Sequence, residues 1–334
     1  MTPLTTGLTR PLTAPLTLGL TGWDAPPAPP VPQTLVLAPD GGRYLAVSVD
    51  DGETWSMVDG GVSGAWDVIY AAGRFVAKII NSSNPTVLVS ADRGHTWETS
   101  QMPALGSSYG IVSLAYADGQ FAAGVHNSAN FFTSPDGLDW TKHTSGAARK
   151  FKCSAFAPPL GRWVSTQGTY TYEIYSDDGG DTWTVANTGA GSFDSENILW
   201  SARRCRFVVF AVQWAGGRYL TSPDGVVWQC HSTLPNHNDW LVARGQEQLD
   251  TVLAFCNTAQ VAVRSDDWLN WTTCQGPGFT IYAQTPAVIY DGRHHRHLAA
   301  GRNVIALKAS ADFGDSWHSL PDPPFKVSAL AVSD

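Results

Sequence analysis

Carboxylates at matching positions of an internal repeat are the residues of this sequence that could do hydrolytic chemistry. Two carboxylates that face each other across a cleft can cleave a glycosidic bond, one as the acid and the other as base or nucleophile. Asp67 and Asp239 hold the same place in two copies of the repeat, where a predicted strand facing the centre of the molecule begins. Asn197 and Cys153 hold that place in two other copies, so a solvated carboxylate without a catalytic role is the alternative interpretation.

Histidines offer a second possible chemistry, which is metal binding. The stretch "GRHHRHL" (292–298) holds His294, His295 and His297, but adjacent residues of a strand point to opposite faces, and an exposed turn is the favoured interpretation. The sequence has no C-x-x-C pair, no Ser-His-Asp signature and no glycine-rich phosphate loop. We therefore expect no metal, no cofactor and no enzymatic activity, with catalysis by a carboxylate pair as the alternative.

The repeat itself is a short polar turn followed by a tryptophan. "SADRGHTW" (90–97) has six counterparts: "SVDDGETW" (48–55), "SPDGLDW" (134–140), "SDDGGDTW" (176–183), "SPDGVVW" (222–228), "SDDWLNW" (265–271) and "SADFGDSW" (310–317). Ser and Asp side chains hold such a turn through bonds to nearby backbone groups, and glycine supplies the positive φ. The sixth copy has Trp268 or Leu269 where glycine is expected, so we expect its turn to differ.

Each copy supplies one aspartate to the turn and one tryptophan as a buried anchor. The aspartates are Asp50, Asp92, Asp136, Asp178, Asp224, Asp267 and Asp312, and the tryptophans are Trp55, Trp97, Trp140, Trp183, Trp228, Trp271 and Trp317. Successive tryptophans lie 42 to 46 residues apart, a period typical of solenoids and propellers.

Four strands fit into each period. Runs such as "DVIYAAGRFVAKI" (67–79) predict a hairpin, a third apolar run ends on the motif serine, and the tryptophan opens a fourth strand. The sequence therefore predicts an all-β fold, a seven-bladed β-propeller of four-stranded antiparallel blades. The first copy lacks an innermost strand, and "KVSALAVSD" (326–334) is similar to the innermost strand "IVSLAYADG" (111–119), so we expect the C-terminal strand to close the ring.

The turn resembles the Asp-box, or BNR repeat, over residues 33–334. This repeat occurs in sialidases, sortilin-type receptors, xyloglucanases, photosystem assembly factors and many phage proteins, where it is a structural turn away from the active site. Sialidase activity is not expected, because the Arg-Ile-Pro signature is absent and sialidase propellers have six blades. The only neighbouring tyrosine and glutamate, Tyr172 and Glu173, fall on a predicted third strand rather than at the axis.

Composition narrows the possible partners. The net charge is −8 and no basic stripe is present beyond small groups such as Arg149, Lys150 and Lys152, so nucleic-acid binding is not expected. No run of 18 apolar residues exists, so we expect no membrane insertion. The odd number of cysteines, 5, argues against a fully paired secreted framework.

Residues 1–32 precede the repeats and have a pattern of their own. "PLTTGLTRPLTAPLTLGLTG" (3–22) repeats a tetrad whose leucines are Leu4, Leu8, Leu12, Leu16 and Leu20, and Pro11 and Pro15 prevent a helix. "APPAPPVP" (25–32) predicts a stiff spacer. A disordered linker is the alternative, but regularly spaced leucines favour an extended arm that docks on a partner. The arm resembles the LT-repeat leaders of structural proteins in tailed phages.

The loops that lead into the innermost strands carry aromatic and amide side chains suited to binding glycans or proteins. The candidate binding residues are Tyr109, Phe193, Asp194, Trp214, Asn236, His237 and Tyr282. The leading hypothesis is a multi-copy structural or adhesion protein of a tailed-phage virion, docked on other virion proteins through residues 1–32, whose propeller binds a host-surface glycan, a host protein or a neighbouring subunit. The alternative is a secreted glycoside hydrolase or carbohydrate-binding module, which should begin with a signal peptide that this sequence does not show.

Overall fold

The computed structural model describes most of the repeat region. The described residues are 31–80, 84–105, 110–125, 128–144, 151–170, 172–191, 193–212, 217–235, 237, 240–256, 260–279, 281 and 287–334, with only the backbone described at 168–170, 193, 194, 196, 211 and 212. The leucines of the predicted arm lie outside these residues, so the arm and its boundary at residue 32 stay predictions.

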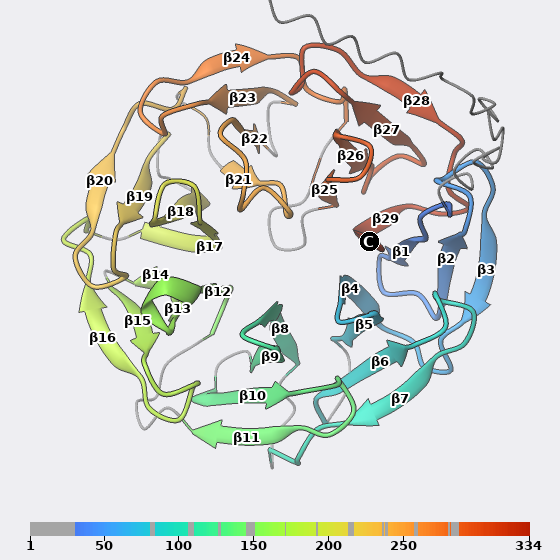
Figure 1. Cartoon of the computed structure of the whole chain (residues 1–334), viewed down its shortest axis with the longest axis horizontal. Helices are drawn as coiled ribbons and strands as arrows, with labels where there is room; N and C mark the ends of the chain where they lie inside the picture. The colour runs from blue at the N-terminus through green and yellow to red at the C-terminus, as the bar shows by residue number, and fades with distance from the viewer. Residues whose placement is uncertain are drawn as a thin grey trace, which may run out of the picture. The chain divides into compact units, whose positions relative to one another are not determined.

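Residues 32–334 form a ring of seven antiparallel blades, as the repeats predict (Figure 1). From the axis outward, the first three blades are β29 (Val327–Val332), β1 (Leu35–Pro39), β2 (Tyr44–Ser48), β3 (Ser56–Asp59); β4 (Ala65–Ala71), β5 (Arg74–Ile79), β6 (Thr86–Ser90), β7 (Glu98–Gln101); and β8 (Ile111–Ala117), β9 (Gln120–Val125), β10 (Asn130–Ser134), β11 (Thr141–Thr144).

The remaining four blades follow the same order. They are β12 (Ser154–Ala157), β13 (Arg162–Ser165), β15 (Tyr172–Ser176), β16 (Thr184–Asn187); β17 (Phe193–Ser201), β18 (Arg206–Val212), β19 (Tyr219–Ser222), β20 (Gln229–His231); β21 (Trp240–Val242), β22 (Val252–Cys256), β23 (Ala262–Ser265), β24 (Thr272–Cys274); and β25 (Val288–Asp291), β26 (Arg296–Ala300), β27 (Leu307–Ser310), β28 (His318–Leu320). A 3-10 turn (Pro158–Leu160) joins β12 to β13.

The C-terminal strand closes the ring, which confirms the prediction. β29 pairs antiparallel with β1, with Leu35 opposite Val332 and Leu37 opposite Leu330. The Gln33 side-chain amide also donates to the Ser333 carbonyl at 2.8 Å. Blade one therefore takes three strands from the start of the repeat region and one from its end, so it has no open inner edge.

One strand was not expected. β14 (Gly168–Tyr170) lies in the connection between β13 and β15 of blade four, yet it pairs with β17 of blade five, with Gly168 opposite Ser195. β17 therefore begins at Phe193, so Phe193 and Asp194, which were predicted to lie in a loop, belong to a strand. A long connection can satisfy its backbone groups by adding to the exposed edge of the neighbouring blade, and sequence periodicity does not reveal such pairing.

The Asp-box turns hold themselves together by side-chain hydrogen bonds. In the copy at 176–183, the Ser176 hydroxyl donates to Asp178 Oδ1 at 2.8 Å and accepts the Gly180 N–H at 2.9 Å. Asp178 also accepts the backbone N–H of Thr182 at 2.9 Å and its hydroxyl at 2.6 Å. Burial is the largest single effect on Asp178 and raises its pKa. The hydrogen bonds together outweigh it, so the pKa of Asp178 lies below its ordinary value.

Each Asp-box turn also packs on the preceding blade. A Cβ on Gly225 would lie 2.4 Å from the Val164 side chain of blade four, and φ at this glycine is +74°. In the sixth copy Trp268 takes the same place at φ 65°, and its N–H donates to Ser265 Oγ at 2.8 Å, just as the Gly225 N–H donates to Ser222 Oγ. The expectation that this turn differs was therefore wrong: the backbone is kept, and the indole packs on Phe210 of blade five.

The anchoring tryptophans differ in burial. Trp140, Trp183 and Trp228 are buried, whereas the other four are only partly buried. Trp183 packs edge-on against Phe131 and Phe151, with each pair of ring centroids 5.0 Å apart, and its indole N–H donates to the Gly180 carbonyl at 2.9 Å.

We expect Trp183→Ala to lower the free energy of unfolding by about 3–5 kcal/mol, the usual cost of deleting a large buried aromatic. Trp97→Ala is the matched control, because it removes the same residue from the same motif where it is half-exposed, and it should cost less. Urea unfolding followed by circular dichroism measures both. Equal losses of stability would show that burial does not set the cost of these tryptophans.

Candidate axial site

The predicted axial carboxylate Asp67 lies in an ion pair, not free at the axis. Asp67 of β4 lies directly opposite Lys78 of β5. Lys78 comes three residues after Phe75, which pairs with the Asp-box serine Ser90, and this count defines the equivalent position in the other blades. The equivalent cross-strand pairs in four other blades carry no charge: Ala329 and Ala38, Ser113 and Gly124, Asn197 and Phe210, Leu241 and Phe255. Leu241, and not Asp239, therefore holds the position equivalent to Asp67, and Asp239 itself lies outside the described residues.

Arg244 reaches Asp67 from another part of the ring. It follows β21 of blade six, while Asp67 belongs to blade two. Its Nη1 and Nη2 donate to the two carboxylate oxygens of Asp67, both at 2.7 Å, and Nη1 also donates to the Val68 carbonyl at 3.2 Å. Lys78 Nζ lies 3.6 Å from Asp67 Oδ2 and donates to the Val112 carbonyl at 2.7 Å. A bidentate pair of this kind fixes the orientation of both groups.

Burial and charge act against each other in this cluster. Asp67 is 1% exposed, and burial alone disfavours its carboxylate, but Arg244 and Lys78 favour it, so the pKa of Asp67 lies below its ordinary value. Burial lowers the pKa of Lys78, although Asp67 opposes the shift. For Arg244, burial is outweighed by Asp67 and the pKa is raised. Asp67 is therefore an ionised, engaged carboxylate.

The chain reaches this place because the connection from β21 to β22 enters the axial space. The Arg244 N–H donates to the Val288 carbonyl at 3.2 Å, and its carbonyl accepts the Tyr290 N–H at 2.7 Å, so residue 244 bridges to β25 in parallel. Gly245 follows with φ +78°, where a Cβ would lie 2.8 Å from the Tyr290 carbonyl oxygen. The Glu247 carbonyl accepts the Ala202 N–H at 2.8 Å and ties the segment to blade five.

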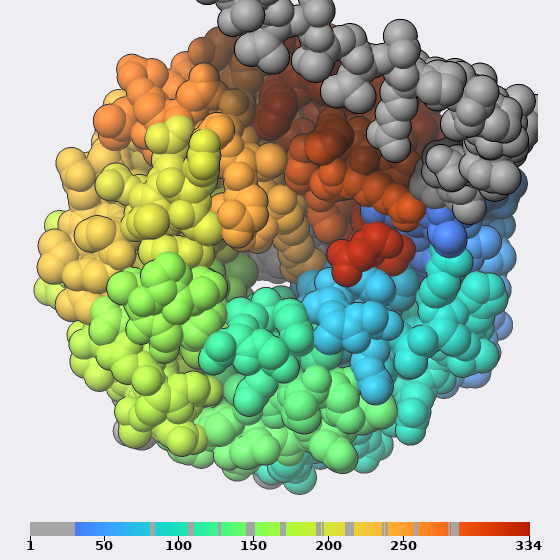
Figure 2. Space-filling view, in the orientation of Figure 1, coloured from blue at the N-terminus to red at the C-terminus, as the bar shows by residue number. Residues whose placement is uncertain are grey.

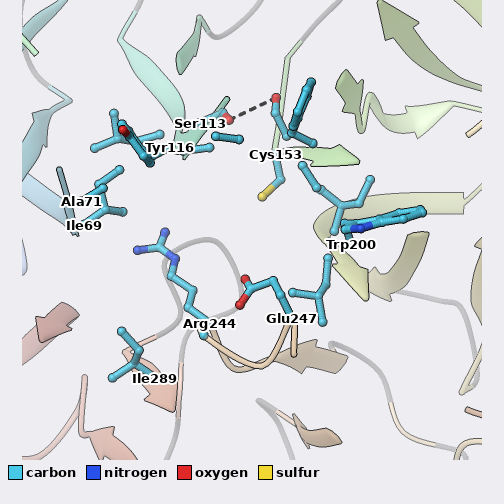
Figure 3. Close-up of a pocket in the computed structure, with 18 of the residues that line it drawn as sticks. Ile69, Ala71, Ser113, Tyr116, Cys153, Trp200, Arg244, Glu247 and Ile289 are labelled. Atoms are coloured by element: carbon cyan, nitrogen blue, oxygen red, sulfur yellow. Dashed lines mark hydrogen bonds between the residues drawn. The ribbon is translucent and has the colours of Figure 1, made fainter. Parts of the chain in front are cut away.

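A pocket of about 540 Å³ opens beside this segment at the centre of the ring (Figures 2 and 3). Arg244 enters from the side of Ile289 and points toward Ile69 and Ala71 of β4, and Glu247 lies beside it (Figure 3). The pocket is also lined by Cys153, Ser113, Asn197, Trp200 and Tyr116. Burial raises the pKa of Glu247, against hydrogen bonds from its own N–H and that of Gly245. The volume suits a small molecule.

Arg244 and Glu247 belong to no motif or repeat position in the sequence, so they were not predicted. The available signal was length: the β21–β22 connection runs from residue 243 to residue 251, whereas β4 and β5 are joined by only 72–73. A polar connection that is long where the other copies have tight turns is a candidate functional segment.

The predicted binding residues in the loops fall largely outside the described residues, so the structure does not test them as a group. Tyr109, Trp214, Asn236 and Tyr282 lie outside the described residues. Phe193 and Asp194 have a described backbone in β17, opposite Tyr170 and Thr169 of β14. His237 is half-buried, with its ring centroid 6.2 Å from that of Trp240. Their role in binding stays a prediction.

The histidine cluster is partly buried, which the exposed-turn interpretation did not predict. His297 is 1% exposed, its Nε2 lies 3.0 Å from Gln246 Oε1, and burial lowers its pKa to about 3. His294 Nδ1 lies 2.9 Å from Asp291 Oδ2. Within the described part of the chain, no group of three or more His, Cys, Asp or Glu side chains could hold a metal ion. His297 therefore acts as a neutral packing residue that supports the Gln246 segment.

Glu173 lies on β15, the third strand of its blade, as predicted. It is 2% exposed, burial raises its pKa to about 8, and it accepts the Gln167 N–H at 3.0 Å. It is therefore a protonated structural residue at neutral pH.

Among the described residues no helix is long and apolar enough to cross a membrane.

Comparisons with known proteins agree with this fold. The model of the BNR/Asp-box repeat matches residues 174–185, so the chain is an Asp-box β-propeller. No curated protein sequence matches it. Similar solved structures include "YCF48 bound to D1 peptide" (TM-score 0.57, 15% identity, 85% of this chain and 86% of that one) and a GH74 xyloglucanase from Xanthomonas campestris (0.63, 15%, 90% and 52%). A functionally unknown protein from Desulfotomaculum acetoxidans is also similar (0.65, 10%, 90% and 99%). At such identities the likeness shows the fold alone.

The axial cluster predicts a definite pattern of stability. Asp67→Asn should cost about 3–5 kcal/mol, because it leaves Lys78 and Arg244 without their counter-charge in a buried place. Lys78→Met in the same protein should restore part of that loss, since it removes one uncompensated charge. Urea unfolding of the two single variants and the double variant measures the coupling. Additive effects would show that Lys78 and Asp67 do not interact.

Proposed function

We propose that this protein is a non-catalytic structural and binding component of a tailed-phage particle. Residues 1–32 dock it on other virion proteins, and the propeller is the outward-facing module that contacts a host glycan, a host protein or a neighbouring subunit.

The observation that carries the non-catalytic part is the engagement of Asp67. Both of its oxygens accept hydrogen bonds from Arg244, and Lys78 lies beside it. A glycosidase needs two carboxyl groups free to face the scissile bond. Asp67 is 1% exposed and its negative charge is compensated by Arg244 and Lys78, so it does not serve as one of them. A rigid scaffold that presents loops is then the natural use of the fold.

A hydrolase on the same scaffold is the second candidate, and Glu247 favours it. Glu247 lines the axial pocket, and its raised pKa is the property of a general acid. The two candidates differ in what Glu247→Gln does to hydrolysis of a panel of plant and bacterial polysaccharides. A hydrolase loses its activity, whereas a binding protein has none to lose.

The arm provides the direct test of docking. Protein truncated to residues 33–334 should melt at the same temperature as the full chain, since the first strand begins at Leu35. It should fail to co-sediment with the particles or subassemblies that retain the full chain. Replacing the five arm leucines with serine is the matched control, because it keeps the length of the arm and removes only its apolar side chains.

Hydrogen exchange adds a second measurement of the same interaction. Amides of residues 3–22 should exchange rapidly in the free protein and slowly in the assembly. Protection of these amides in the free monomer would show that the arm packs on its own chain, and co-sedimentation of the truncated protein would show that docking lies elsewhere. Either result would overturn the proposal.

A further inference from the structure

Arg244 keeps one side of its guanidinium unused. A guanidinium has five N–H donors in a planar fork. Nη1 donates to Asp67 and Val68, and Nη2 donates once, to Asp67. Among the described residues, the Nε–H and the second N–H of Nη2 have no partner. These two donors lie on the same edge of the fork, which is the geometry that binds a carboxylate through two parallel hydrogen bonds.

This free edge is held in place before any ligand arrives. Asp67 is 1% exposed, and its two oxygens accept hydrogen bonds from Nη1 and Nη2 on the other edge, both at 2.7 Å. The guanidinium therefore cannot rotate freely. The Arg244 side chain itself is 26% exposed and lines the axial pocket of about 540 Å³. A donor pair that is oriented in advance binds an anion without the entropic cost of ordering a free side chain.

Trp200 lines the same pocket and holds a donor that solvent does not reach. Trp200 of β17 is 4% exposed, and its indole N–H has no hydrogen-bond partner among the described residues. Trp200 lies on the other side of Glu247 from Arg244 (Figure 3). A buried donor without a partner costs free energy, and a ligand oxygen that accepts from it recovers that cost.

The free donors of Arg244 favour an anionic group, and the acceptors beside them favour a hydrogen-bond donor near that group. Arg244 brings a positive charge to the pocket lining, and Asp67, Asp118 and Glu247 bring acidic groups, so an anion is held by the two free N–H donors of Arg244 and not by an excess of positive charge. The Glu247 carboxyl beside Arg244 supplies oxygens that accept hydrogen bonds. The walls formed by Ile69, Ala71 and Ile289 are apolar and provide no partner for a second charged group on the ligand.

We propose that the axial pocket is a binding site for a small organic carboxylate. The carboxylate lies on the free edge of Arg244, and a hydroxyl or ammonium next to it donates to Glu247. The site is independent of the arm, so it exists whether or not residues 1–32 dock the protein on a particle.

Isothermal titration calorimetry of the full chain tests the chemistry of the ligand. Glucuronate carries a hydroxyl beside its carboxylate and glutamate carries an ammonium; glucose lacks the carboxylate, and glutarate lacks the neighbouring donor. At least one of the first two should bind about tenfold more tightly than its control, a difference of about 1.4 kcal/mol. No binding of either, equal binding of the controls, or tighter binding of inorganic phosphate would overturn the proposal.

Variants then locate the site. Arg244→Lys keeps the charge and loses the planar fork, so binding of the preferred probe should fall about tenfold or more. Arg203→Lys is the matched control, because Arg203 is an exposed arginine paired with Asp250, and it should change nothing. Unchanged binding in Arg244→Lys would overturn the assignment.

Two milder variants keep the test decisive if Arg244→Lys fails to fold. Trp200→Phe removes only the indole N–H and the second ring, and Glu247→Gln keeps the shape of the side chain and replaces one of its oxygens with an amide donor. Each should weaken binding of the preferred probe, and Glu247→Gln should reduce the preference over the control that lacks the donor. Normal binding in both variants would place the ligand outside this pocket.

Discussion

The contact between each Asp-box turn and the blade before it is the constraint on which the ring depends. A turn at φ near +74°, as at Gly225, presents bare backbone to the neighbouring sheet, so the next blade can approach within contact distance of Val164. The same contact recurs around the ring, for example between Gly94 and Val47, between Gly137 and Val76, and between Gly180 and Phe131. Because hydrogen bonds from its own serine and aspartate stabilise the turn, the turn keeps its shape without contacts from the neighbouring blade. Trp268 shows that glycine itself is not required at this position. A large residue can take its place if it adopts the same positive φ and if the facing residues of the previous blade leave room for its side chain.

The fold could be predicted from the sequence because the interactions that define each turn join residues close together in the chain. Serine, aspartate, glycine and tryptophan act within eight residues of one another, so seven copies in phase specify the blade, the ring and its closure by β29. The axial site depends instead on residues that are far apart in the chain. Asp67 and Arg244 are 177 residues apart, and no spacing rule connects them. A repeat alignment could place Asp67 at the axis, but it could not show that a connection in blade six would fold inward to neutralise it. The strand β14 was unpredictable for the same reason, since it pairs with a blade to which it does not belong by sequence.

The axial ion pair joins two blades that are not neighbours in the ring. A buried ion pair contributes little net stability compared with apolar packing, but breaking it leaves a charge in a place where water does not reach. Asp67 of blade two and Arg244 of blade six meet only if the ring has the curvature that seven blades give. A ring with a blade more or a blade fewer would move these two groups apart and leave Asp67 and Lys78 buried without Arg244.

Closure by β29 also has a consequence for how the protein is made. β1 and β29 are paired although Gln33 and Ser333, at their ends, are 300 residues apart. At a synthesis rate of about 5–20 residues per second, blade one waits roughly 15 to 60 seconds on the ribosome for its inner strand. During that time β1 has an unpaired edge, in a chain whose neighbours on a polysome carry the same edge. Two chains on one polysome are therefore exposed to exchanging strands while blade one is incomplete, and a chaperone that covers a free β edge would prevent that exchange.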